Sequence, residues 1–595
     1  MGVFQLKIVA NFYKLSSSNG GSLMKYKNAL YFLWEEVSRF KKELFINFIL
    51  ILSFIPLVAV TPFLIENLMQ EITTINDGQG MKSALITALL ILVIYSFTRL
   101  IWFLSDYHGD ILKLLVKGSL REKLYLKVLK LPASYHKRKP SGELMARFTS
   151  DIDIVGEEAL FFTSVFQAIA EFSVGCYVAF KLNTYLAIIF VCSLPIYLLC
   201  QKQFKPKMES MSLLEREAND NVVKSIEEGI NSAIIIRLLE KTIYFYHLFQ
   251  NKIRNWHNSM KNKSFYEKLY NSITTYIEEG LPIIILCIGA ILSMRGLVDI
   301  PTLIAFFTFV GRLYVPVWNL AFLFTTTPAA FPSIDRIETL LNQEEEKVRK
   351  GMPFPKEFTI DFHDVFFSYE GNNYILKNIN LQIGKGEKIA IVGSTGTGKS
   401  TLLLLLTELY KPQRGEILLN KLKLSQYDLS DLRRNIKYVE SSPFIFNASI
   451  EENILLGEKV EKRTINEILE ITQLTEFSES LNKNCLLLSS GQKQRVNLAR
   501  TLLHPPKVLL LDEATSAMDS HTEELIFERL KEKEKDMTII LVSHRLSTII
   551  KADRIYFMAN GTIVDSGSHI ELYQKNESYR ELFRKQYVKD AQNDK

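Results

Sequence analysis

The fold of the second half of this 595-residue chain is decided by one stretch, Gly393-Ser394-Thr395-Gly396-Thr397-Gly398-Lys399-Ser400-Thr401. An apolar run at 388–392 precedes it and a leucine-rich run at 402–406 follows it, which predicts a strand, a glycine loop and a helix in that order. Glycines let the backbone turn its N–H groups inward, and the positive end of the helix points to the same place. We therefore predict that residues 393–401 bind the phosphates of a nucleotide, with Lys399 on the β and γ phosphates and Ser400 on Mg²⁺.

The average composition of the chain combines two unlike parts. Hydrophobic residues make up 47% of it, but the long apolar stretches lie before about residue 330, and the remainder is typical of a water-soluble α/β domain. The net charge of +6 is spread along the chain, so we expect no nucleic-acid partner. The five cysteines show no metal-binding spacing, and we interpret them as small buried apolar residues: Cys176, Cys192, Cys200, Cys287 and Cys485.

Six apolar runs are long enough to cross a bilayer, which takes ~20 residues. They lie at 45–65, 84–104, 160–180, 185–204, 273–293 and 302–325. The predicted fold class is a multi-domain membrane protein, in which a six-helix all-α transmembrane domain is followed by an α/β P-loop ATPase domain. The predicted boundaries are an N-terminal tail at 1–29, the transmembrane domain at 30–335, a linker at 336–357 and the ATPase domain at 358–590.

The N-terminal segment is not a secretory signal, because residues 1–23 lack a continuous apolar core and a cleavage-type ending. Translation starts either at Met1 or at Met24; the second start would leave the first 23 residues as a tail.

The connections between the spans indicate orientation. Those after the first, third and fifth spans are short and hold few positive charges, whereas those after the second and fourth are long and rich in lysine and arginine. By the positive-inside rule, both long connections and both termini are cytoplasmic, which predicts a multi-pass protein of the plasma membrane with its ATPase domain in the cytoplasm. Apolar residues recur at helical spacing in 105–158, so we expect helices that extend beyond the membrane and reverse at 135–144 and near 212–222.

Charged residues occur inside the last two spans at Glu278, Glu279 and Arg312. Such residues usually face a partner or a cavity. Because the glutamates and the arginine lie at similar depths, either Glu279 pairs with Arg312 between adjacent helices or these residues line a substrate cavity. The aromatic residues of the spans could face lipid, pack against other helices or contact the cargo. They are Tyr95, Phe97, Trp102, Phe103, Phe306, Phe307, Phe309, Tyr314 and Trp318.

A second motif, Leu509-Leu510-Leu511-Asp512-Glu513, is a hydrophobic strand that ends in two acids. A buried strand that delivers a carboxylate beside a P-loop suits Mg²⁺, so we assign Asp512 to the ion through water. Glu513 follows directly and is placed to orient or deprotonate the attacking water.

The stretch Leu488-Ser489-Ser490-Gly491-Gln492 precedes a predicted helix and supplies another anion site at a helix N-terminus. Together with the P-loop, Leu510–Asp519 and Val542-Ser543-His544-Arg545, it follows the order of motifs in an ABC-transporter ATPase. With six spans in front, the chain from about residue 30 to 585 resembles a half-size ABC exporter of the bacterial multidrug and lipid-A-exporter type.

The resemblance implies roles for further residues. Tyr369 matches the aromatic residue that stacks on adenine, and His544 matches the histidine that contacts the γ-phosphate. Asp519 matches a loop that crosses to the other subunit. The signature residues Ser489, Ser490, Gly491 and Gln492 match the segment that closes over ATP held by the opposite P-loop. Because one chain has one P-loop and one signature segment, two sandwiched ATP molecules require a dimer, either of this chain or with a second half-transporter.

Two departures from the family pattern lie between the ATP site and the membrane domain. Ser441 stands where the family has a glutamine that touches Mg²⁺; Glu440 could substitute by a shift, a water could fill the gap, or coupling could be weak. In addition, the segment 478–487 lacks the family's Gly-Glu-containing loop. We expect unusual coupling, which fits a non-identical partner half.

The sequence thus predicts ATP-driven export of an amphipathic drug, lipid or peptide across the cytoplasmic membrane by alternating access of a dimer, with ATP and Mg²⁺. Two other interpretations are an ATP-gated channel or membrane regulator, and a dedicated peptide exporter. No peptidase domain precedes the spans, so we do not expect the chain to process a peptide leader. A soluble ATPase is excluded if the six spans are inserted.

Overall fold

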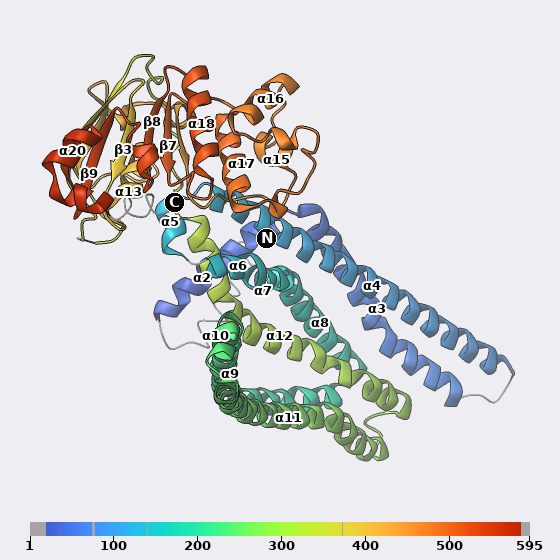
Figure 1. Ribbon diagram of the computed structural model, residues 1–595. Helices are drawn as coiled ribbons and strands as arrows, with labels where there is room; N and C mark the ends of the chain where they lie inside the picture. Colours follow the sequence, from blue (N-terminus) through green and yellow to red (C-terminus); the bar gives the residue numbers. More distant parts are fainter. Residues whose placement is uncertain (1–19, 74–77, 140, 372, 585–595) are drawn as a thin grey trace. The chain divides into compact units, whose positions relative to one another are not determined.

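A computed structural model describes residues 20–73, 78–139, 141–371 and 373–584 (Figure 1). Contacts between residues divide the chain into two compact units. The helical unit comprises residues 1–128 and 142–343, and the ATPase unit comprises 129–141 and 344–595. The short segment 129–141 therefore belongs with the ATPase unit although it interrupts the helical one.

Long helices dominate the helical unit (Figure 1). The principal ones are α2 (Gly20–Val37), α3 (Lys41–Thr73), α4 (Gly78–Leu129), α8 (Phe161–Leu182), α9 (Thr184–Asn231), α11 (Thr242–Met294) and α12 (Ile300–Leu341). Shorter pieces connect them: α6 (Ser141–Ala146), a π-helical turn at Arg147–Asp151, α7 (Ile152–Glu157), a 3₁₀ turn at Glu158–Leu160 and α10 (Ala233–Leu238). At 53 residues α11 is roughly 80 Å long, so it exceeds a hydrocarbon layer of about 30 Å, as predicted for the extended helices.

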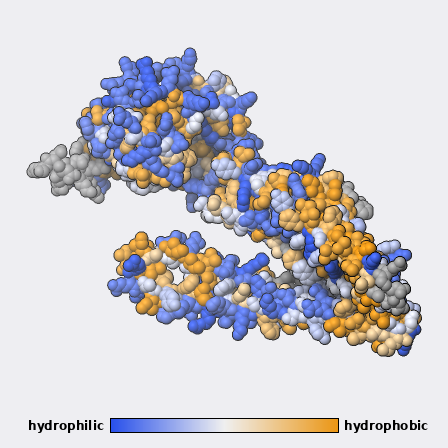
Figure 2. All heavy atoms as spheres, turned by 90° about the vertical axis from the view of Figure 1, so that its right-hand side faces the viewer, coloured by the Kyte–Doolittle hydropathy of each residue, from blue (hydrophilic) through white to orange (hydrophobic). Residues whose placement is uncertain are grey.

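Five of these helices are long and apolar enough to span a membrane: those that contain the predicted spans 45–65, 84–104, 160–180, 273–293 and 302–325. The predicted span 185–204 lies in the first part of α9, which in sequence is apolar from Thr184 to Cys200. Polar residues from Gln201 onward end that apolar stretch. Apolar side chains gather on the surface of the helical unit (Figure 2), and on α4 Leu85 is 65% exposed, as expected of a surface that faces lipid.

Helices α9 and α11 pack side by side and antiparallel, and their contacts correct the second predicted turn. The Trp256 indole and the Lys263 ammonium of α11 both donate to the Glu215 carboxylate of α9, at 3.1 Å each. These contacts lie in the middle of the region predicted to reverse, near 212–222, and α9 continues unbroken to Asn231. The reversal occurs instead at residues 232–241, because Gly229, Asn231 and Ser232 weaken the helix there.

The ATPase unit contains two sheets (Figure 1). The antiparallel sheet has the order β2-β1-β4-β5, with β1 at Thr359–Phe367, β2 at Leu376–Gly384, β4 at Arg414–Leu419 and β5 at Leu422–Lys423. The larger sheet has the order β10-β9-β3-β8-β7-β6, with β3 at Lys388–Val392, β6 at Ile436–Val439, β7 at Val508–Asp512, β8 at Thr538–Val542, β9 at Arg554–Ala559 and β10 at Thr562–Gly567. All of its neighbouring pairs are parallel except β9 and β10.

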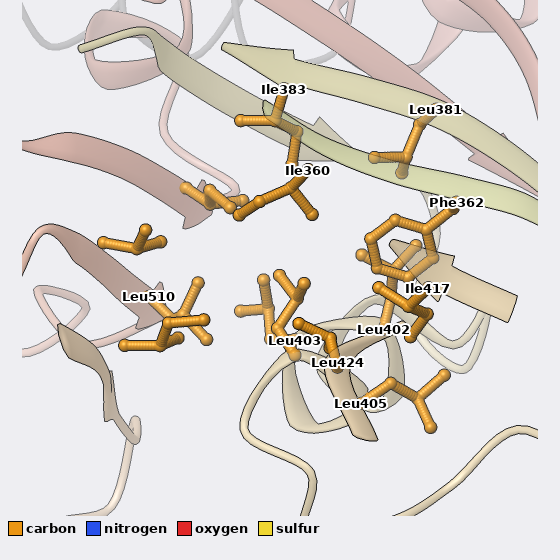
Figure 3. Packing of buried hydrophobic residues seen from close by; sticks show 14 of the residues in the cluster. Ile360, Phe362, Leu381, Ile383, Leu402, Leu403, Leu405, Ile417, Leu424 and Leu510 are labelled. Atoms are coloured by element: carbon orange, nitrogen blue, oxygen red, sulfur yellow. The ribbon is translucent and has the colours of Figure 1, made fainter. Parts of the chain in front are cut away.

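Helix α13 (Lys399–Leu406) packs between the two sheets (Figure 3). Its Leu402 and Leu403 are fully buried against β1 and β2 residues such as Ile360, and against Leu510 of β7. The leucine-rich run after the P-loop is therefore apolar because both of its sides meet a sheet.

The remaining helices flank the larger sheet or form a separate helical cluster. They are α5 (Ala133–Arg138), α14 (Leu429–Asn435), α15 (Ile450–Leu455), α16 (Lys462–Ile471), α17 (Ser490–Leu502), α18 (Ser520–Lys533), α19 (Leu546–Ile549) and α20 (His569–Lys575). Helices α15, α16 and α17 share one apolar core, which also includes the buried Cys485. This burial matches the expectation for that cysteine, whereas Cys192 and Cys287 are exposed on the helical unit and the expectation is wrong for them.

Candidate nucleotide site

The larger sheet brings the predicted site segments together. The P-loop follows β3, Ser441 follows β6, Asp512 ends β7 and His544 follows β8. These strands are neighbours in the order β3-β8-β7-β6 and are parallel, so their carboxyl ends lie at one edge. Segments that are far apart in sequence therefore lie around the carboxyl ends of these strands, which is where open α/β sheets bind ligands.

The P-loop has the backbone that a phosphate cradle requires. Gly396 and Gly398 have φ of 85° and 96°, in the left-handed region that favours glycine. A side chain at Gly393 would collide with the carbonyl oxygen of Met558 on β9. Glycine is thus needed at both ends of the loop, and α13 begins directly after it at Lys399.

The Lys399 ammonium folds back over the loop. It donates to the carbonyl oxygens of Gly393 and Ser394 at 2.8 and 2.9 Å. Burial lowers the pKa of Lys399, while the nearby Glu513 and Asp512 carboxylates act in the opposite direction. A phosphate bound in the loop would add negative charge beside this ammonium and favour its charged form further.

Glu513 and His544 form a pair at the same edge. Their closest atoms, Glu513 Oε1 and His544 Nε2, are 2.9 Å apart. Glu513 has a φ of 49°, a left-handed conformation that costs on the order of 1 kcal/mol or more in a residue with a side chain. Its N–H donates to the carbonyl oxygen of Val542 at 3.0 Å, which ties this backbone to the end of β8. Such a strained, held carboxylate suits a residue that must be aimed at a substrate.

Asp512 has a partner that the sequence reasoning missed. The Tyr438 hydroxyl of β6 donates to Asp512 Oδ2 at 2.7 Å, and Asp512 is buried. Burial, together with this hydrogen bond, raises the pKa of Tyr438, so the phenol remains a donor. The available signal was the position of Tyr438 on β6, shortly before Ser441, but the pairing of β6 with β7 had to be known.

The donors at this edge fit a magnesium ion that is held mainly by phosphate and water. Ser400 supplies a hydroxyl at the start of α13, and Asp512 supplies a carboxylate at the end of β7. Within the described part of the chain, no group of three His, Cys, Asp or Glu side chains could hold a metal by itself.

The signature segment forms the capped start of α17. Ser489 Oγ accepts from the N–H of Gln492, and Gln492 Oε1 accepts from the N–H of Ser489 at 3.0 Å, so these two residues cap the helix reciprocally. A side chain at Gly491 would lie 2.6 Å from the carbonyl oxygen of Ala517. Glycine therefore allows the helix start to approach the loop that follows β7.

Two buried or half-buried side chains tie that loop to its surroundings. Gln494 Nε2 donates to the Ser441 carbonyl at 2.8 Å, and Gln494 Oε1 accepts from the Ala517 N–H at 3.0 Å. Arg545, next to His544, donates to the Ser516 carbonyl at 3.0 Å and to Glu523 at 2.9 Å. The segments that contain Ser441, the signature, Asp519 and His544 thus form one hydrogen-bonded network. Sequence reasoning did not single out Gln494.

Several predicted residues have local roles in the structure. Asp519 caps α18 by accepting from the N–H of Thr522 at 2.8 Å, and its hydrogen bonds to Thr522 lower its pKa. Ser441 and Glu440 are both exposed, and Ser441 is held through its carbonyl. The segment 478–487 is tied to the start of α15, where Ile450 N–H donates to the Lys483 carbonyl at 3.0 Å.

Tyr369 lies beside the P-loop helix. Its hydroxyl is 3.1 Å from Thr401 Oγ1, and its ring packs edge-on against Tyr410 and Phe367, with centroids 5.1 and 5.0 Å away. The Lys137 ammonium of α5 lies over the same ring, 3.1 Å from its centroid. A lysine from the predicted turn at 135–144 therefore occupies the aromatic surface predicted to receive adenine.

The three predicted charges of the spans have different surroundings. Arg312 lines a cavity in the helical unit, whereas Glu278 accepts from the Tyr197 hydroxyl at 3.2 Å. Glu279 is exposed. Among the ion pairs of the described residues, none joins Glu279 to Arg312, so the predicted pair is not formed; Glu278 instead finds its partner on the adjacent α9.

This combination of apolar helices and a P-loop site defines an ATPase attached to a membrane domain. Residues 44–317 match the ABC transporter transmembrane region, and residues 376–516 match the ABC transporter family. An export ATP-binding/permease protein of Rickettsia typhi is 28% identical over 94% of this chain and 99% of its own length. The ATP-dependent permease MDL1 of Candida albicans is 30% identical over 78% of this chain and 72% of its own length.

A solved structure, a bacterial Atm1-family ABC exporter with ATP bound, has the same fold. Its TM-score is 0.79 at 20% identity, and the match covers 92% of this chain and 99% of the other. The chain belongs to the ABC exporters, as a half-transporter with one transmembrane and one ATPase domain, and it binds and hydrolyses ATP to drive export.

Removal of the Tyr438 hydroxyl tests its role in holding Asp512. We expect Tyr438→Phe to raise the Mg²⁺ concentration for half-maximal ATPase activity by about tenfold, since a hydrogen bond to a charged group contributes about 1.5 kcal/mol or more. Tyr427→Phe is the matched control, because it removes another buried tyrosine hydroxyl, which donates to the Leu419 carbonyl at 2.8 Å. Equal Mg²⁺ dependence in both variants would contradict the role.

Removal of the Lys137 ammonium tests whether it competes with adenine for the Tyr369 ring. We expect Lys137→Ala to lower the ATP concentration for half-saturation by roughly threefold to tenfold, the range of a cation–π contact. Arg138→Ala removes the neighbouring exposed charge of α5 as a control. Titration with a fluorescent nucleotide measures the ATP affinity of both variants. Unchanged or weaker binding in Lys137→Ala alone would show that Lys137 does not compete with adenine for the Tyr369 ring.

Proposed function

We propose that this half-transporter works as a dimer, with itself or with a second half-transporter, that moves an amphipathic drug, lipid or peptide out across the cytoplasmic membrane by alternating access. The observation that carries the proposal is the Glu513–His544 pair at the edge of the sheet, beside a P-loop and a carboxylate suited to magnesium. It favours a turnover-driven pump over an ATP-gated channel, because a gate needs binding but no water-activating carboxylate.

In the proposed reaction, Glu513 accepts a proton from the water that attacks the γ-phosphorus, and ADP leaves with the electrons of the broken P–O bond. His544, whose Nε2 lies 2.9 Å from Glu513 Oε1, would hold that carboxylate and contact the γ-phosphate. Lys399 leaves its loop carbonyls for the β and γ phosphates, while Tyr369 stacks on adenine. Magnesium, when bound near Ser400 and Asp512, would neutralise phosphate charge.

Pairing follows from the chain's single P-loop and single signature segment. Ser489, Ser490, Gly491 and Gln492 of one chain would close over ATP on the P-loop of the other, near Asp519. The Gln494 contacts would carry that closure to the Ser441 segment, because Gln494 joins that segment to the loop after β7. Arg545 would link the same loop to the His544 segment. Both termini and the ATPase domain would lie in the cytoplasm.

The assignment of Glu513 is tested by Glu513→Gln. We expect steady-state ATPase activity to fall at least about a hundredfold, the usual contribution of a general base, and ATP with Mg²⁺ to trap a closed dimer. Mass photometry in detergent would detect the trapped species, with and without a second half-transporter. Glu532→Gln, on the exposed face of α18, is the control. Retained hydrolysis in Glu513→Gln would defeat the assignment.

A further inference from the structure

A cavity of about 340 Å³ lies in the helical unit among α3, α4, α8 and α12. Its walls are largely apolar and aromatic, and include Phe54, Trp102 and Phe309. Three charged side chains also line it: Arg99 of α4, Glu171 of α8 and Arg312 of α12. Of these three charges, the sequence predicted only Arg312 as a residue of a cavity. Arg99 and Glu171 could be recognised only once the packing of α4 and α8 beside α12 was known.

The cavity holds more positive than negative charge. Arg99 donates to the neutral Tyr95 hydroxyl at 3.1 Å, and its guanidinium lies 5.1 Å from the Tyr95 ring centroid. Glu171 accepts from the Gln167 amide at 2.8 Å. Within the described residues, neither arginine forms an ion pair, and Arg312 has no hydrogen-bond partner. The cavity therefore holds two guanidinium groups, Arg99 and Arg312, and one carboxylate, Glu171. Neither guanidinium group forms an ion pair with that carboxylate.

Two of these charges, Arg312 and Glu171, lie well inside the predicted membrane spans. Arg312 is twelve residues into α12, which begins at Ile300, so it lies about 18 Å along the helix. Glu171 is eleven residues before the end of α8 at Leu182, at about the same depth. Arg99 and Arg312 are both exposed in the single chain, so a ligand in the cavity can reach them. Charges inside membrane spans usually face a ligand or an ion path.

We propose that this cavity takes an amphipathic anion, with its phosphate or carboxylate head on Arg312 and Arg99 and its apolar part against the aromatic wall. The inference rests on the proposed function and names the charge of its cargo. Guanidinium suits such heads because it offers several N–H donors in a plane, and apolar walls with a few polar anchors are typical of ligand pockets.

The test compares probes that share one tail and differ in head: decyl phosphate, decyltrimethylammonium and decyl maltoside, each below its micelle concentration. Inorganic phosphate serves as a tail-free anion. Binding to the full-length protein in nanodiscs of zwitterionic lipid is measured by thermophoresis, and ATP-dependent uptake is measured in proteoliposomes. We expect decyl phosphate to bind at least about tenfold more tightly than the other three, as for one charge-assisted hydrogen bond.

Substitutions test whether Arg312 and Arg99 cause the preference for the decyl phosphate head. We expect Arg312→Gln to weaken decyl phosphate binding by about tenfold to a hundredfold relative to decyl maltoside, as for loss of a charge-assisted hydrogen bond. Arg312→Lys should restore part of the preference, and Arg99→Gln should reduce it. Arg295→Gln, at the exposed end of α11 outside the cavity, should leave the ratio unchanged.

The outcomes separate the inference from the proposed function. Equal binding of the three decyl probes, preference for the cation, or a ratio insensitive to Arg312→Gln would overturn the anion inference. Binding of inorganic phosphate as tight as that of decyl phosphate would overturn the amphipathic part. ATP-driven uptake of decyl maltoside or the cation, but not of decyl phosphate, would leave the exporter function intact while the inference fails. If no probe is taken up and Glu513→Gln traps no dimer, the proposed function fails instead.

Discussion

The ATP site depends on the parallel register of β3, β8, β7 and β6. Parallel strands end at the same edge, so each loop that leaves them contributes to one site. Strands β7 and β8 are buried along their whole lengths, so their ends are held firmly by the core. A shift of one residue between β7 and β8 would move Asp512 and Glu513 away from His544 and turn their side chains to opposite faces.

Around that edge, the loops are joined to one another by hydrogen bonds. Gln494 connects the Ser441 segment with Ala517, and Arg545 connects the His544 segment with Ser516. Because these contacts are made mostly to backbone carbonyls and N–H groups, they hold loop positions without prescribing the loop side chains. The Ser441 segment is therefore held through its backbone carbonyl, whatever side chain stands at position 441.

The membrane part uses charge in a different way from the ATPase part. In the ATPase unit the buried Lys399 is satisfied by loop carbonyls and nearby carboxylates. In the helical unit, within the described residues, neither arginine of the cavity forms an ion pair; Arg99 donates only to the Tyr95 hydroxyl, and Glu278 accepts from the Tyr197 hydroxyl. Unsatisfied charge in a low-dielectric region is costly, so it marks a place where a ligand supplies the missing group.

By itself, the sequence determined the class of fold, the P-loop, the acidic strand end and the extended helices, because these depend on local composition and periodicity. It also indicated the segment around α5 as a turn. The tertiary structure alone decided which residues meet: Tyr438 with Asp512, Gln494 with Ser441, Lys137 with Tyr369, and Arg99 with Arg312 around one cavity. It also moved the second turn from near 212–222 to 232–241. Such pairings depend on strand order and helix packing between distant segments, which no local pattern specifies.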